Sequence, residues 1–459
     1  MIAAVPNEPG RWRNRTTFVL ALSASAIGLG NIWRFSYLSG EYGGAPFIIT
    51  YLLCLFLIAV PVMVAEVVMG SSGGASPVTA IRRACDRSLL SRAWMLVGVL
   101  ACLTGLLMLS FYIVVAGWSM AYVGFMDSGV FSAARAAEVG EHFEHLLADP
   151  AQQIYWQSLF LLCVFGTIIL GVRRGLGLLV WLAVPVMFAL LAFLIKFGFD
   201  NGDIDTTRDF LFSIHWVDFS PQSVLVALGH AFFTLGVGVG TGISYGAYAP
   251  HRIPVGRSVM AVAVIDTMIA LLAGLAIFPI VFANNIAPSA GPGLLFISLP
   301  YAFGNVVQGE LSGTVFFALV VLAALGSAVA MMEPIVAALT RSSRLERFTA
   351  ALLVGVVVWL LSVAVVMSFQ SGAELWWIGQ QSLFGFLDAL TAKVLLPLVA
   401  LLIAVLAGWQ LRPEILRIEL DRESRLFFSL WRFVLRYIAP PAIALLLLLP
   451  LLSAWMQVE

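Results

Sequence analysis

The stretch from Ala24 to Arg34 carries the residue types best suited to chemistry in this chain. It contains Gly28 and Gly30, followed by the amide of Asn31 and the guanidinium of Arg34, inside a long apolar run. Each glycine costs a helix about 1 kcal/mol relative to alanine, so the pattern predicts that the helix unwinds here. Unwinding exposes carbonyls that can hold a cation and N–H groups that can hold a carboxylate.

A second interrupted run lies at residues 232–242, where Gly236, Gly238, Gly240 and Gly242 alternate with other residues. No strand precedes these glycines, so a dinucleotide-binding loop is excluded. An unwound backbone at membrane depth must be buried in protein or line a cavity. Two breaks at corresponding positions of two halves indicate a binding site in a transporter built from inverted repeats.

The elements that position these breaks are membrane helices. The chain is 61% hydrophobic and 11% charged, which excludes an ordinary soluble domain. A crossing needs roughly 20 apolar residues. Eleven segments meet this requirement, near residues 17–40, 46–70, 94–124, 155–171, 177–199, 222–249, 257–284, 311–339, 348–369, 390–409 and 432–456.

The distribution of basic residues predicts the orientation. Most of the 25 Lys and Arg residues lie in the N-terminal stretch and the loops on one side of the membrane. The positive-inside rule therefore places the N-terminus in the cytoplasm and, after eleven crossings, the C-terminus outside. The first 16 residues have no apolar core, so we expect no cleaved signal peptide. No nucleic-acid surface is indicated, and the oligomeric state is left open.

Two strings carry a resemblance to a known family. The segments Gly28–Phe35 (GLGNIWRF) and Glu41–Phe47 (EYGGAPF) resemble the first helix and loop of the neurotransmitter:sodium symporters, particularly their bacterial amino-acid branch. The resemblance implies an all-α LeuT fold in one domain, 1–459, of the cell inner membrane, with helices 1 and 6 broken. It also implies repeats at 17–199 and 222–409, an extra helix at 432–456, and sodium-driven uptake by alternating access.

The resemblance implies a substrate site and two sodium sites. Their ligands are oxygen donors, which suit sodium. The expected substrate-binding residues are Ser25, Leu29, Gly30, Met108, Tyr112, Phe233, Gly236, Val239, Ser327 and Met331. The first sodium site would use Ala26, Asn31, Thr234 and Asp266, and the second would use Ala24, Ile27, Ala323 and Ser327.

The resemblance also implies gating residues, each with a simpler alternative. Arg34 is expected at an outer gate, or as an interfacial anchor. Glu66 is expected to brace the broken helices, or to be an interfacial acid. Tyr248 is expected at the inner gate, and Pro185 to allow local opening, or to form a static kink. The family's outer-gate acid matches Thr391, although Asp388 is near, and Arg341 occupies the likely place of the inner-gate acid.

Several positions depart from the family or stay open. His230 stands where glutamine is more usual and is expected to be a hydrogen-bonded structural residue, although it could titrate. We expect His142 and His145 to be solvated. At the second sodium site the family uses two adjacent side-chain ligands on the eighth helix, and here Gly326 precedes Ser327, so only Ser327 offers a side-chain oxygen. We therefore expect Gly326→Thr to raise sodium affinity.

The resulting hypothesis is a sodium-coupled importer, not an enzyme, that carries a neutral amino acid with a large hydrophobic or aromatic side chain. Gly28 supports a substrate with its own carboxylate, because monoamine carriers of the family have Asp there. One or two sodium ions are expected and no chloride, since Asp266 supplies a fixed negative charge. The alternatives are a carrier of a small amino acid or osmolyte and, more remotely, an ion channel.

Overall fold

The computed structural model describes residues 11–74, 76–214, 219–250, 252–286, 293–342, 345–370, 377–378 and 381–456. These residues form helices, apart from one antiparallel pair of two-residue strands, β1 (Trp377–Ile378) and β2 (Gln381–Ser382). Among them, nine helices are long and apolar enough to cross a membrane, and the bent pair Arg15–Ala26 and Gly30–Glu41 makes a tenth crossing. The predicted all-α membrane architecture is confirmed.

The first five crossings extend from α1 to α9. Crossing one is α1 (Arg15–Ala26), a π-helical turn (Gly30–Arg34) and α2 (Phe35–Glu41), and crossing two is α3 (Ala45–Cys54), a π-helical turn (Leu55–Ala59) and α4 (Val60–Gly73). There follow α5 (Pro77–Ser88), a short 3₁₀ turn (Arg92–Trp94), α6 (Met95–Asp127), α7 (Ala136–Ala148), α8 (Pro150–Ile169), a π-helical turn (Val172–Leu176) and α9 (Gly177–Asn201).

The remaining crossings begin after α10 (Ile204–Phe212). They are α11 (Pro221–Leu235) with α12 (Thr241–Ala247), α13 (Val255–Ala283), α15 (Gly309–Ser342), α16 (Arg347–Met367), α17 (Leu383–Leu390) with α18 (Leu396–Val405), and α20 (Arg425–Phe433) with α21 (Ala439–Met456). The π-helical turns Thr391–Leu395, Leu406–Gln410 and Val434–Ile438 continue the last two crossings, and Leu294–Ser298 leads into α14 (Leu299–Gly304). The connecting helix α19 is Pro413–Glu419.

Both predicted helix breaks are present. The two halves of crossing one are bent by 56°. Between α11 and α12, Gly236, Gly238 and Gly240 have φ values of 65°, 93° and 77°, a left-handed region that favours glycine because it has no Cβ. The helix therefore unwinds at these positions for a steric reason. α11 alone is too short to cross, and α11 together with α12 corresponds to the eleventh segment, the one predicted at 222–249.

Two predicted boundaries were too late in the chain. The tenth crossing was expected at 390–409, but its helical segment begins at Leu383, before Asp388. The hydropathy pattern stops at this acid, whereas the helix continues because Asp388 is paired with Arg34 of crossing one. The last crossing was expected at 432–456 and begins at Arg425. The predicted external C-terminus, residues 457–459, lies outside the described residues.

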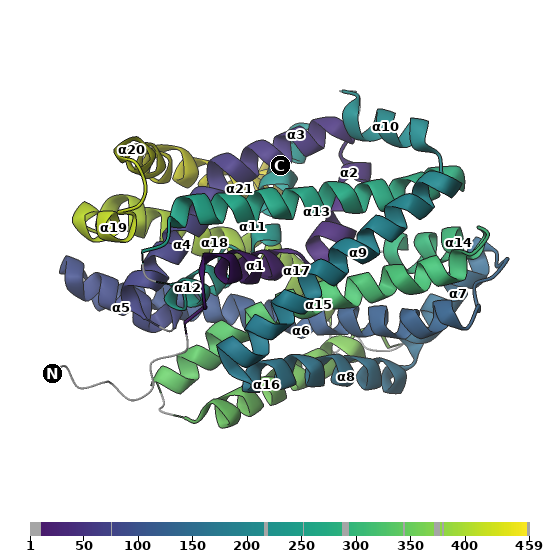
Figure 1. The fold of residues 1–459 in the computed structure, drawn as a ribbon, viewed down its shortest axis with the longest axis horizontal. Helices are drawn as coiled ribbons and strands as arrows, with labels where there is room; N and C mark the ends of the chain where they lie inside the picture. Colours follow the sequence, from purple (N-terminus) through teal and green to yellow (C-terminus); the bar gives the residue numbers. More distant parts are fainter. Residues whose placement is uncertain are drawn as a thin grey trace.

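The two ends of the bundle carry different helices. In Figure 1, α5, α19 and α20 gather at one end of the long axis, and α7, α10 and α14 gather at the other. The long helices α6, α9, α13 and α15 run between these ends, and α1 and α12 lie among them near the centre. The two broken crossings are thus surrounded by unbroken helices.

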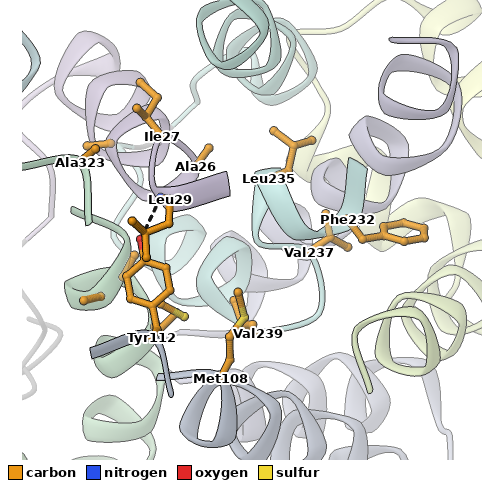
Figure 2. Packing of buried hydrophobic residues seen from close by; sticks show 14 of the residues in the cluster. Ala26, Ile27, Leu29, Met108, Tyr112, Phe232, Leu235, Val237, Val239 and Ala323 are labelled. Atoms are coloured by element: carbon orange, nitrogen blue, oxygen red, sulfur yellow. Dashed lines mark hydrogen bonds between the residues drawn. The ribbon is translucent and has the colours of Figure 1, made fainter. Parts of the chain in front are cut away.

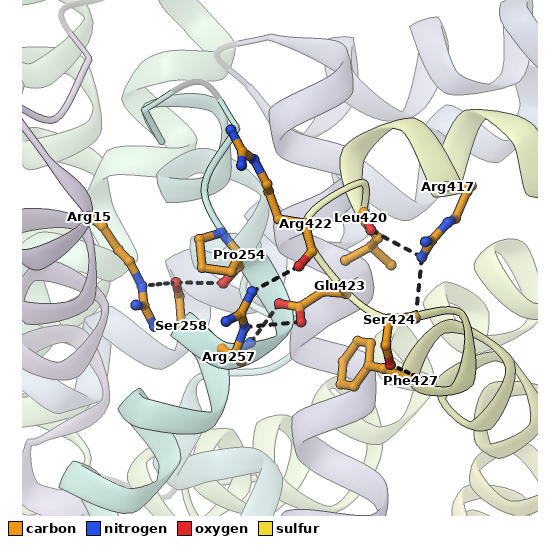
Figure 3. A network of polar contacts seen from close by, with 10 residues as sticks. All are labelled: Arg15, Pro254, Arg257, Ser258, Arg417, Leu420, Arg422, Glu423, Ser424 and Phe427. Atoms are coloured by element: carbon orange, nitrogen blue, oxygen red, sulfur yellow. Dashed lines mark hydrogen bonds and ion pairs between the residues drawn. The ribbon is translucent and has the colours of Figure 1, made fainter.

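The end that holds α5, α19 and α20 is tied together by arginine contacts (Figure 3). The Arg257 guanidinium contacts the carboxylate of Glu423 at 3.3 Å, and the Arg257 amide donates to the same carboxylate. Arg15 at the start of α1 donates to Ser258, whose hydroxyl donates to the Pro254 carbonyl. These bonds connect α1, α13 and the turn before α20.

Two side chains hold the second break and the start of α12. The Gly238 amide donates to the Glu66 carboxylate at 2.8 Å, and Glu66 is fully buried on α4. The Thr241 hydroxyl donates at 3.0 Å to the carbonyl of Ala330 on α15. This carbonyl lies four residues before Pro334, which has no N–H to donate to it. Thr241 therefore supplies the hydrogen bond that the proline removes from α15.

We predict that Thr241→Val destabilises the protein by about 1 to 3 kcal/mol, because valine keeps the shape but leaves the buried Ala330 carbonyl without its donor. Thr241→Ser keeps the hydroxyl and serves as the control. Thermal unfolding in detergent should show a lower midpoint for the valine variant than for the serine variant. Equal midpoints for the two variants would contradict this role of the hydroxyl.

Candidate functional site

A cavity lies between the two helix breaks, at the centre of the bundle. The cavity is lined by residues of crossing one, α6, α11, α12 and α15. Nine of the ten predicted substrate-binding residues line it, and the tenth, Leu29, lies directly above. The lining also contains five residues outside that predicted set, namely Ala26, Gly28, Thr234, Thr241 and Ala330.

One end of the cavity is polar (Figure 2). The Leu29 amide donates to the Tyr112 hydroxyl at 3.3 Å, which fixes the hydroxyl beside the break in crossing one. A Cβ atom at Gly28 would meet the Ser327 hydroxyl and lie 2.7 Å from the Tyr112 hydroxyl oxygen. Position 28 therefore has no room for a side chain. A phenol hydroxyl and the backbone amides of a helix break are donors that suit a carboxylate.

The opposite wall is apolar. Met108 and Val239 lie close together below Tyr112 in Figure 2, and both are buried. Phe233 and Met331 complete this wall. Methionine side chains are flexible and adapt their shape, so the wall can accommodate apolar groups of different outline. The cavity thus has one polar end and one adaptable apolar end.

A buried carboxylate, Asp266, lies beside the cavity and collects three hydrogen bonds. The Asn31 amide donates at 2.7 Å, the Thr234 hydroxyl lies 3.1 Å from both oxygens, and the Tyr51 hydroxyl donates at 3.3 Å. Ala26, the fourth predicted member of this ion site, lines the cavity. Within the described parts of the chain, no basic side chain pairs with Asp266. A buried negative charge favours a bound cation here.

The predicted second ion site is also brought together. The Ser327 hydroxyl lies 3.0 Å from the Ser25 carbonyl and 3.1 Å from the Ile27 carbonyl, at the end of α1. Ala323, one turn before Ser327, faces a small void together with Ile27. The backbone of Gly326 touches the Ala24 carbonyl. The donor set consists of hard oxygens, which fits sodium.

The expected effect of Gly326→Thr was wrong in its physical premise. A Cβ atom at Gly326 would collide with the carbonyl oxygen of Ala24, and that carbonyl is itself a predicted ligand. The space that an added hydroxyl would need is therefore occupied by backbone. A side chain at this position would displace the Ala24 carbonyl before it could contribute an oxygen.

Above the cavity, Arg34 closes the path. Its guanidinium lies 3.2 Å from the Asp388 carboxylate and 4.4 Å from the centre of the Phe233 ring. Thr391, which was matched to the gate acid, is buried and donates to the Leu387 carbonyl. That match was wrong by three residues, which is nearly one helical turn. A second cavity lies on the outer side of this pair and is lined by aromatic residues including Trp33, Tyr37, Phe111 and Phe384.

Below the cavity, the closing contacts centre on α12. The Tyr248 hydroxyl donates to the Glu333 carboxylate at 2.7 Å, and the Arg347 guanidinium pairs with the same carboxylate at 2.5 Å. The Trp12 ring packs edge-on against Tyr245 and Tyr248. Glu333 is the acid of this group.

The remaining predicted positions have mixed outcomes. α9 continues through Pro185 as one helix. His230 is buried between Phe35 and Tyr51, and neither ring nitrogen has a hydrogen-bond partner in the described structure, so the expected hydrogen bond is not found.

The two histidines of α7 differ from each other. His142 packs against Phe125 and Phe131, and burial, with a smaller effect of His145, lowers its pKa. His142 is therefore only partly solvated. His145 is exposed, 3.7 Å from Glu141.

Sequence reasoning missed three residues of the site. Tyr51, which holds Asp266, was read as part of an apolar run. Arg347 was counted only as a loop charge. Thr241 was noted only as one residue of the glycine-rich stretch. Pro334 could have indicated its role, because a proline in a buried helix leaves the carbonyl four residues earlier without its hydrogen bond.

Comparisons with known proteins agree with this geometry. The sequence model of the sodium:neurotransmitter symporter family matches residues 9–130 and 145–457. An uncharacterized sodium-dependent transporter of Bacillus subtilis (strain 168), YhdH, is 32% identical over 445 residues, 96% of this chain and 97% of the relative. An uncharacterized sodium-dependent transporter of Haemophilus influenzae is 27% identical over 442 residues, 94% of this chain and 95% of the relative.

A solved structure is similar over nearly the whole chain. MhsT in complex with L-phenylalanine matches with a TM-score of 0.87 and 35% identity, covering 96% of this chain and 99% of that chain. This likeness confirms the predicted LeuT-type fold with helices 1 and 6 broken, and the relatives are transporters and not enzymes. On the match of the family model and of these relatives, the chain belongs to the sodium:neurotransmitter symporter family.

Proposed function

We propose that the protein is a sodium-coupled importer of neutral L-amino acids with large hydrophobic or aromatic side chains. The observation that carries this is the cavity between the breaks. Its polar end, with Tyr112 and the amides of Leu29 and Gly30, suits an α-carboxylate. Its apolar end suits a large side chain, and the similar MhsT structure contains L-phenylalanine.

Asp266 couples the substrate to an ion in this proposal. A sodium ion held by Ala26, Asn31, Thr234 and Asp266 would lie beside the polar end, where it also attracts the substrate carboxylate. A second sodium ion would be held by Ala24, Ile27, Ala323 and Ser327. The chain's own contribution is to gather oxygens on both sides of the break, so that ion and substrate binding stabilise the same closed arrangement.

Transport by alternating access requires the two closures to open in turn. The outer closure depends on Arg34 and Asp388, and the inner one on Tyr248, Glu333 and Arg347. Opening of the inner side would involve α9 near Pro185 and rocking of the proposed repeats, 17–199 and 222–409. The basic residues of the N-terminal stretch and of the loops on one side of the membrane support a cytoplasmic N-terminus.

Uptake into sealed vesicles tests the proposal directly. We expect accumulation of phenylalanine, tryptophan or leucine above the outside concentration under an inward sodium gradient, and none without sodium. A channel would equilibrate its solute without accumulating it, and a carrier of small amino acids or osmolytes would prefer glycine or alanine.

The first prediction concerns side-chain size. Val239→Phe should shift the preference toward smaller amino acids, because a phenyl ring at this position fills the apolar end of the cavity. Val239→Ala, which enlarges the same wall, is the matched control and should retain the preference for large side chains. Competition against labelled substrate in detergent measures both. Stronger competition by phenylalanine than by alanine in a folded Val239→Phe protein would contradict the assigned wall.

The second prediction concerns chloride. The Asp266 carboxylate already provides a negative charge beside the first ion site, so replacement of chloride by gluconate should leave uptake nearly unchanged. Asp266→Asn keeps the size of the side chain and removes the charge, and should lower apparent sodium affinity at least tenfold, equal to about 1.4 kcal/mol. If uptake responds neither to the anion nor to this substitution, Asp266 is not an ion ligand.

The third prediction concerns the second ion site. Gly326→Ala places a methyl group against the Ala24 carbonyl and should weaken the dependence of substrate binding on sodium, without changing which amino acid is preferred. Gly355→Ala is a suitable control, because a Cβ atom there has its nearest neighbour at 3.9 Å. Titration of substrate binding with sodium compares the two variants. A sodium response equal to that of the control would remove Ala24 from the site.

A further inference from the structure

An apolar groove runs along the outer surface of the bundle, away from the central cavity. It lies between the end of α8 and the first turns of α9, with Leu322 of α15 behind it. Its wall residues Leu170, Leu178 and Leu182 are 60%, 57% and 61% exposed. Since these helices cross the membrane, the groove opens toward lipid and not toward water.

The groove has a cation at one end and an apolar stripe along its length. Arg174, Leu178, Leu182 and Val186 follow each other at intervals of four residues, which places them on one side of the helix. This stripe is about 18 Å long at 1.5 Å per residue. One leaflet of a bilayer has a hydrocarbon thickness of about 15 Å, so the stripe has the length of one acyl chain.

The charges at the mouth of the groove have the same sign. Arg174 is exposed and, in the described parts of the chain, has no hydrogen bond or ion pair. The neighbouring Arg173 donates to the Arg11 carbonyl, which is neutral, so its charge is also not compensated by this bond. Arg347 donates to the Ile168 carbonyl at the end of α8, but Glu333 compensates its charge, so the uncompensated positive charge at the mouth belongs to Arg174 and Arg173. The mouth therefore favours an anion.

We propose that this groove binds an anionic phospholipid. The phosphate would contact Arg174, with Arg173 beside it, and one acyl chain would lie along Leu178, Leu182 and Val186. Guanidinium groups match phosphate oxygens in geometry, and each basic residue at the membrane surface adds about 1 kcal/mol of attraction for anionic lipid. The groove lies on the outer surface of the bundle and is separate from the substrate and ion sites.

The position of the groove gives the lipid a structural effect. The backbone of Gly175 touches the Thr167 carbonyl, so α8 and the start of α9 are in close contact at the bottom of the groove. A lipid that fills the groove contacts both helices and adds apolar burial to this contact. Bound anionic lipid should therefore raise the thermal stability of the protein more than zwitterionic lipid of the same acyl chains.

Lipid retention measured by native mass spectrometry tests the proposal on the full-length protein in detergent. The probes are phosphatidylglycerol and phosphatidylcholine with identical acyl chains. We expect the wild type to retain more phosphatidylglycerol, and Arg174→Gln to lower this retention about fivefold, as expected from about 1 kcal/mol. Arg82→Gln is the matched control, because Arg82 is an exposed arginine on α5, at the same end of the bundle but away from the groove.

The acyl-chain part of the site is tested separately with Leu182→Trp, which fills the stripe. This variant should lower retention of phosphatidylglycerol although all arginines remain. Equal retention of the two lipids by the wild type, equal loss in the Arg174 and Arg82 variants, or unchanged retention in Leu182→Trp would each overturn the proposal. Thermal unfolding in lipid-free detergent checks that the variants are folded, and Arg174→Lys, which keeps the charge, should retain most of the lipid preference.

Discussion

Two helices of this protein end inside the bundle, and each backbone group freed there needs a partner in a place without bulk water. An unpaired buried polar group costs about 1 to 3 kcal/mol, so the breaks persist because other elements supply donors and acceptors. Glu66 accepts from Gly238, Thr241 donates to Ala330, and Ser327 donates to carbonyls at the end of α1. The positions of α4, α12 and α15 follow from this pairing.

The closures above and below the cavity are built on the same helices as the cavity itself. Arg34 is in the same half-helix as Asn31, and Glu333 lies two residues after Met331 on α15. Only a few residues of one helix therefore separate the lining of the cavity from each closure.

Polar residues in apolar runs were predictable as site residues. Burying a polar side chain in a membrane costs free energy, so such residues usually serve a function. Asn31, Thr234 and Asp266 are of this kind, as are the glycines of the second break. Tyr51 was not predictable, since a tyrosine in a span is compatible with simple packing. The choice between Asp388 and Thr391 depends on which face of a helix meets Arg34. The carbonyl of Ala24 that blocks Gly326 becomes visible only in three dimensions, because backbone positions leave no mark in the sequence.

The hydroxyl of Ser327 has one proton, and two carbonyl oxygens lie within hydrogen-bond distance of it. A hydroxyl that coordinates a cation must turn its proton away from the ion, so in the proposed second sodium site Ser327 could not donate to the Ile27 carbonyl and share a sodium ion with it at once. Ion and proton therefore compete for the same oxygen. The sodium affinity of this site depends on the difference in free energy between the hydrogen-bonded and the ion-bound arrangements. A substitution that strengthens the hydrogen bond would therefore weaken sodium binding.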